Sequence, residues 1–103
     1  MTSGLTVGKP VIAEMVRLAA FEVPGVQAVA HAGGMWRRLL MAPPVEVHLE
    51  GNRVAVRLSI VARPGQALTP LVAQVRSAVG ATVERLLGLE LDGVSVVVDG
   101  VGG

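Results

Sequence analysis

Apolar and polar residues alternate from residue 45 to residue 63 with the period of two that is typical of β-strands. Gly51-Asn52 interrupts the alternation, and a two-residue loop of this kind favours a tight hairpin turn. The turn fixes the register, so we expect Glu46 to face Arg57 and Glu50 to face Arg53. One face of the hairpin is expected to be buried: Val45, Val47, Leu49, Val54, Val56, Leu58 and Ile60. The opposite face carries Glu46, His48, Glu50, Arg53, Arg57, Ser59 and Arg63.

Two stretches repeat apolar residues at the three- to four-residue spacing of an amphipathic helix. The first begins at Pro10 and ends before Pro24, because a residue that precedes proline disfavours the helical conformation. Its expected inward face includes Val11, Ile12, Met15, Leu18 and Ala19. The second covers residues 68–87, with Thr69 as the expected N-cap and Gly88 as the residue that ends it.

A valine-rich strand follows, with Val94, Val96 and Val98 expected to face the core. The order helix, strand, strand, helix, strand predicts an α+β fold: a three-stranded, mostly antiparallel sheet with two helices packed on one face. We expect the last strand beside the first, which makes every pair antiparallel. If the last strand instead ran parallel to the second, the joining helix should cross over with right-handed connectivity.

Residues 31–44 form a variable segment with the only tryptophan of the chain. Trp36, Leu39 and Leu40 have the spacing of one or two turns of amphipathic helix, with Arg37 and Arg38 turned outward. Two interpretations stay open: Trp36 closes one end of the core, or Trp36, Arg37 and Arg38 form a docking patch for a protein or a membrane surface. The 103 residues are otherwise expected to form a single domain, with a loose leader at 1–8 and a loose tail at 102–103.

Composition excludes several kinds of chemistry. The chain has no cysteine, which excludes a disulfide framework and thiolate catalysis. His31 and His48 have no partner at metal-ligand spacing, and no serine lies in a nucleophile motif, so we expect no enzyme activity, metal or cofactor. The net charge of +1 gives no electrostatic signature of nucleic-acid binding. No stretch predicts a signal peptide or a membrane-spanning helix, and a cytoplasmic location is expected.

Three stretches together resemble the alkaline shock protein family, which is linked to envelope stress in Gram-positive bacteria. They are VIAEMVRLAAFEVPGV (11–26), VEVHLEGNRVAVRLSIVARPG (45–65) and the stretch 68–101, which ends in LLGLELDGVSVVVDGV. The resemblance implies a cytoplasmic, non-enzymatic protein that self-associates and is held at the membrane by a small membrane-anchored partner. Residues 28–44 and 63–65 depart from the family pattern, which puts partner choice in doubt.

The charged sheet face has two interpretations: a solvated surface, or a surface for self-association or for binding a partner. We expect a homo-oligomer with Val97, Arg57 and Glu46 near the contact, because Val97 is an apolar residue on the face away from the helices. Trp36 is the alternative anchor.

An RNA-binding domain of the KH type has the same order of elements. Such domains use a basic Gly-x-x-Gly loop between helices, whereas the only such spacing here is Gly100 to Gly103, without a basic residue.

Overall fold

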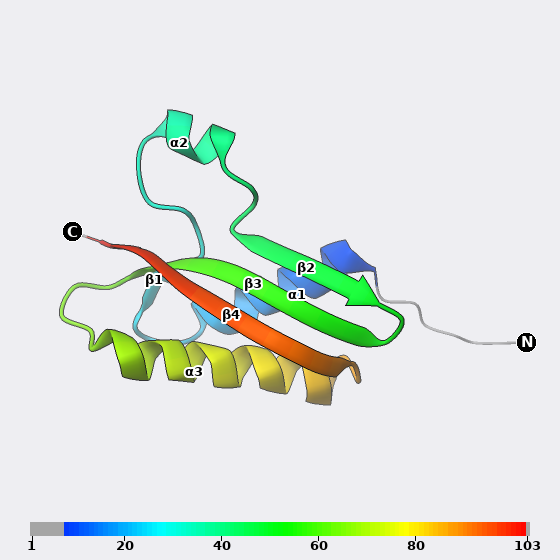
Figure 1. The fold of residues 1–103 in the computed structure, drawn as a ribbon. Coiled ribbons are helices and arrows are strands. Elements are labelled where there is room, and N and C mark those ends of the chain that lie inside the picture. Colours follow the sequence, from blue (N-terminus) through cyan, green and yellow to red (C-terminus); the bar gives the residue numbers. More distant parts are fainter. Residues whose placement is uncertain (1–7, 103) are drawn as a thin grey trace, which may run out of the picture.

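Figure 1 shows the computed structural model of the chain, which describes residues 8–102. For Met35, Arg37 and Arg38 it describes the backbone alone. Most of the expected leader, residues 1–7, and Gly103 of the expected tail lie outside the described residues. Gly102 donates its N–H to the carbonyl of Ala62 at 2.8 Å, so it continues the pairing of the last strand.

The hairpin has the predicted register. β2 (Val45–Glu50) and β3 (Arg53–Ala62) are antiparallel, with Glu46 opposite Arg57 and Glu50 opposite Arg53. Val54, Val56, Leu58 and Ile60 are fully buried or nearly so, as predicted for the inward face. Ser59, expected on the exposed face, is buried instead, because the chain that enters β2 lies beside it and Pro44 accepts its N–H at 2.8 Å.

β3 is the central strand of a four-stranded sheet. β2 and the short β1 (Val26–Ala28) follow one another along one side of β3, both antiparallel to it. β4 (Glu90–Val101) runs along the whole other side, parallel to β3. The expectation that the last strand lies beside the first strand of the hairpin, which is β2, is therefore wrong. The α+β class and the two helices on one face are confirmed, and two of the three strand pairings are antiparallel.

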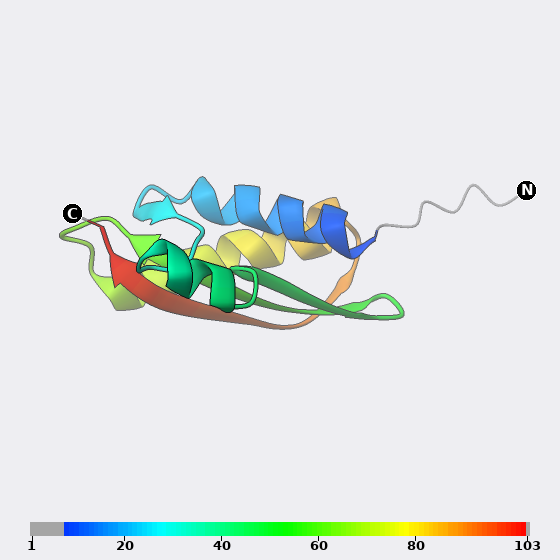
Figure 2. The same cartoon turned by 90° about the horizontal axis from the view of Figure 1, so that it is seen from above.

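Both long helices pack on one face of the sheet (Figure 2). α1 (Lys9–Phe21) and α3 (Leu68–Ala81) lie side by side and antiparallel, which leaves the other face open. α3 joins the parallel strands β3 and β4, and Figures 1 and 2 together show that it crosses over right-handed, the hand expected for such a connection.

α1 is rotated relative to the prediction. Ile12, Val16 and Ala20 are its buried residues, whereas Val11 and Leu18 are about half exposed. Apolar residues occupy most of this helix, so their spacing alone does not determine which side faces the core.

α3 begins one residue before the predicted cap. Its N-cap is Ala67, because the Ala67 carbonyl accepts the N–H of Leu71, and Thr69 lies inside the helix. The last turn widens into the π-helix η1 (Thr82–Leu86), in which Leu87 donates to Thr82 at 3.0 Å. Gly88 then ends the helix as predicted, with a φ of 68° that disfavours other residues.

The variable segment forms a short helix, α2 (Met35–Leu40), outside the two-layer body (Figure 1). Trp36 is 78% exposed and Leu40 is 84% exposed. The interpretation that Trp36 closes one end of the core is therefore wrong. A one- to two-turn helix at this position was expected and is present.

Candidate interaction surface

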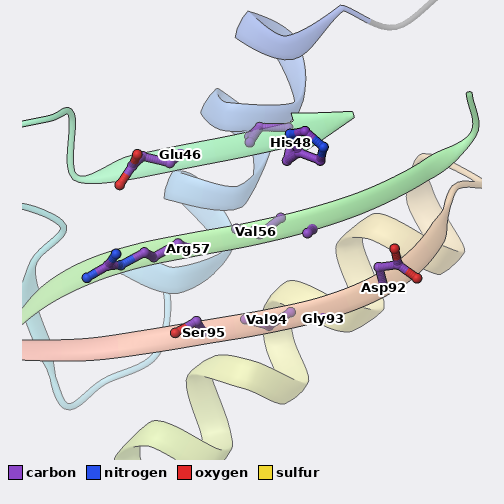
Figure 3. Close-up of a pocket in the computed structure, with 10 residues that line it drawn as sticks. Glu46, His48, Val56, Arg57, Asp92, Gly93, Val94 and Ser95 are labelled. Carbon is purple, nitrogen blue, oxygen red and sulfur yellow. The ribbon is translucent and has the colours of Figure 1, made fainter. Parts of the chain in front are cut away.

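The open face of the sheet is built in rows that cross β2, β3 and β4. One row joins Glu46, Arg57 and Ser95, because Arg57 is the register partner of both of the others. The next row toward the hairpin turn joins His48, Ala55 and Gly93. The small residues Ala55 and Gly93 leave a shallow hollow, and Figure 3 shows it bordered by longer side chains from all three strands.

Val97 lies one row further from the turn, where its register partner is Ser59. It is half-buried, so part of its apolar surface faces solvent on the open face. The structure therefore gathers three of the predicted contact residues, Glu46, Arg57 and Val97, within adjacent rows. Whether they form a contact remains a prediction.

Charge is concentrated at the hairpin end of the open face. Arg53 donates to the carboxylate of Asp92 at 2.5 Å and lies 3.4 Å from Glu90, both on β4. The hydrogen bond to Asp92, reinforced by the charges of Asp92 and Glu90, raises the pKa of Arg53. All three side chains are about half exposed, so solvent weakens these ion pairs. Glu50 is the backbone partner of Arg53, as predicted, while the guanidinium reaches across to the neighbouring strand.

A second polar cluster links the variable segment to the end of β4. His31 is almost buried, and its Nε2 lies 2.7 Å from the carbonyl oxygen of Ala42. Its Nδ1 lies 3.5 Å from Asp99 Oδ2, the same oxygen that accepts the N–H of Ala32 at 2.8 Å. No local sequence pattern indicates this cluster, because its members are brought together only by the fold.

α2 presents the apolar side chains that sequence reasoning singled out. Trp36, Leu39 and Leu40 are each more than two-thirds exposed. Arg37 and Arg38 belong to the same helix, but the positions of their side chains lie outside the description. Because α2 is separated from the open-face residues by the segment that leads into β2, it forms a second candidate surface rather than an extension of the first.

The described residues bear on three alternatives: a metal site, a membrane-spanning helix and RNA binding. Among residues 8–102, no group of three or more His, Asp or Glu side chains is placed to hold a metal ion. In the same range, no helix has the length and hydropathy needed to cross a bilayer. Gly100 lies within β4 rather than in a loop between helices, so the arrangement does not match the RNA-binding alternative.

Comparisons with known proteins place the chain in a family. A family model described as having a cell envelope-related function matches residues 2–102. The chain is therefore an α+β domain of a family with a cell envelope-related function. The chain belongs to the alkaline shock protein family, as its three characteristic stretches predicted.

Solved structures with the same fold come from another protein. The MamM CTD in a manganese form is 18% identical, with a TM-score of 0.59, and the match covers 90% of this chain and 99% of that one. A zinc form is 18% identical with a TM-score of 0.58, covering 88% and 84%. Identities this low show a shared fold only. No curated protein sequence matches the chain.

Proposed function

We propose that this protein acts at the cell envelope by assembling with itself and by binding a small membrane-anchored protein from the cytoplasmic side, without catalysing a reaction. The observation that carries the proposal is the exposure of Trp36, Leu39 and Leu40 on a short helix outside the body of the domain. Large apolar side chains that gather at the surface typically mark a binding site for another protein. Family membership supports the envelope setting.

The two candidate surfaces suit the two parts of this function. The open sheet face carries Glu46 next to Arg57 and the half-buried Val97, a mixture that can match itself across a two-fold axis. α2 offers an apolar anchor, and no acidic residue occurs between Val23 and Val45, so its surroundings suit a partner with negative charge.

Sedimentation of the wild type, Val97→Lys and Trp36→Ala tests the self-association. We expect an oligomer for the wild type, dissociation by Val97→Lys, and no effect of Trp36→Ala. A wild type that stays monomeric at high micromolar concentration would exclude self-association. Dissociation by Trp36→Ala alone would move the contact to α2 and would overturn the assignment to the sheet.

Capture from the detergent-solubilised membrane fraction of the native cell tests the second part. The immobilised wild type should retain a protein with a membrane-spanning segment, and Trp36→Ala should lose it. Leu86→Ala is the matched control, because Leu86 is an exposed apolar residue on η1, away from α2. Equal capture by Trp36→Ala and the wild type would refute α2 as the binding element.

A further inference from the structure

The outer edge of β4 has no partner strand among the described residues. β4 pairs with β3 along one side only, and the sheet ends there. Edge strands are normally protected by charged residues, proline or a covering segment, because their free N–H and C=O groups pair readily with another strand. From Gly93 to Val98 this edge reads Gly-Val-Ser-Val-Val-Val, which contains neither a charge nor a proline.

Two irregularities bound this uncharged stretch. The pairing with β3 skips one residue at Asp92 and again at Asp99, so each aspartate is an extra residue in a β-bulge. Both carboxylates bond within their own chain, Asp92 with Arg53 and Asp99 with the N–H of Ala32. The six residues between the bulges are therefore a regular strand with an unprotected edge.

Two backbone hydrogen bonds show which residues turn outward. Glu90 donates its N–H to the carbonyl of Asn52, and Gly102 donates its N–H to the carbonyl of Ala62. The backbone N–H and C=O groups of the even-numbered residues of β3 therefore point toward β4. The extra residue at Asp92 reverses which residues of β4 have their backbone groups toward β3. The extra residue at Asp99 restores the original pattern. Between the bulges, Ser95 therefore faces β3, and the N–H and C=O groups of Val94, Val96 and Val98 point away from it.

We propose that this edge pairs antiparallel with the same edge of a second copy, about a two-fold axis at Val96. This inference rests on the self-association proposed above, and it moves the contact from the open face to the adjoining edge of β4. Only this register pairs all three outward residues: Val94 with Val98 of the second copy, Val96 with Val96, and Val98 with Val94. It also sets Asp92 opposite Gly100 of the second copy, which is the residue next to the bulge at Asp99.

A second copy fits this edge because the outward residues are the same in either direction along the strand. The three outward residues are all valine, and their side chains all pack toward the helix face, so the two sheets join with their apolar faces on the same side. Pairing through the edge leaves the open face and α2 free for the membrane-anchored partner.

Cysteine cross-linking tests the register, since the natural chain has no cysteine. In the proposed pair, Ser95 lies opposite Val97 of the second copy, at the Cα separation of about 4.5 Å found in antiparallel pairs without hydrogen bonds. That spacing permits a disulfide. Ser95→Cys mixed with Val97→Cys should therefore cross-link several-fold faster than either variant alone. In either variant alone the two cysteines occupy the same position in both copies, and such positions lie diagonally about 7–8 Å apart.

A control variant separates the edge from the open face. Arg57→Glu, added to both cysteine variants, should leave cross-linking unchanged, because Arg57 lies on the central strand. Loss of the cross-link in this background would overturn the edge in favour of the open face, and fastest self-cross-linking of Ser95→Cys would overturn the register. If sedimentation shows an oligomer but no mixture cross-links, the edge pairing fails while the proposed self-association stands. A wild type that sediments at the 10.6 kDa of one chain overturns both.

Discussion

His31 Nδ1 lies 3.5 Å from Asp99 Oδ2, which connects the variable segment to the last strand. The Nε2 of the same ring reaches the carbonyl of Ala42, where the segment returns toward β2. The imidazole therefore ties both ends of the segment that carries α2 to the body of the domain.

Removing this ring should destabilise the protein. We expect His31→Ala to lower the free energy of unfolding by about 1–3 kcal/mol, because the nearly buried ring loses both its packing and its hydrogen bond to the carbonyl of Ala42. Denaturant unfolding measures the change, and His48→Ala, on the exposed sheet face, is the control that should stay within about 0.5 kcal/mol of the wild type. In a double-mutant cycle with Asp99→Ala, the two residues should be coupled by about 0.5–3 kcal/mol. Additive effects would show that the ring and the carboxylate act independently.

Gly100 should not tolerate a side chain. A Cβ at this position would lie 2.6 Å from the Cβ of Ala32, so Gly100→Ala should cost about 1–3 kcal/mol of unfolding free energy through overpacking. Gly34→Ala is the control, because no atom beyond Gly34 and its two chain neighbours lies within 4 Å of a Cβ placed there. Ala32→Gly, combined with Gly100→Ala, removes the clash and should recover part of the loss. A double variant no more stable than Gly100→Ala would contradict this contact.

Leu58 should be a major contributor to the core. Its side chain is fully buried on the central strand, so Leu58→Ala should lower the free energy of unfolding by about 2–5 kcal/mol. Leu40→Ala removes the same atoms from an exposed position on α2 and should change it by less than about 0.5 kcal/mol. A loss below about 1 kcal/mol for Leu58→Ala would be inconsistent with full burial.

Trp36 should report on partner binding without contributing to stability. Because it is the only tryptophan and is 78% exposed, its fluorescence should be red-shifted and readily quenched by acrylamide in the free protein. Binding of the membrane-anchored partner should shift the emission to the blue and protect it from quenching. Trp36→Ala should melt with the wild type, and destabilisation above about 1.5 kcal/mol would mean that the ring packs against the domain.

The sequence predicted those features that depend on neighbouring residues. The register from Glu46–Arg57 to Glu50–Arg53 followed from a two-residue turn, and the end of the long helix followed from Gly88. The position of β4 could not be predicted in the same way, because an uncharged valine strand pairs equally well with either free edge of the hairpin. The rotation of α1 was missed because this helix is apolar on more than one side.

Local alternation along the strands also predicted part of the candidate surfaces. Glu46, Arg57 and Val97 share the open face because strand alternation places them there. The contact of His31 with Asp99 was missed, because it needs the parallel placement of β4 and a fold of the chain over the end of the sheet. Polar clusters of this kind become visible only once non-local strand pairing is known.

The parallel pairing of β3 with β4 also affects how the chain acquires its structure during synthesis. β2 and β3 can form their hairpin soon after they leave the ribosome, since they are adjacent in the sequence. The long side of β3 must wait until α3 and the whole of β4, to Val101, have been made. Contacts between distant parts of a chain slow folding. The nascent domain therefore exposes an incomplete sheet to chaperones until its last strand emerges.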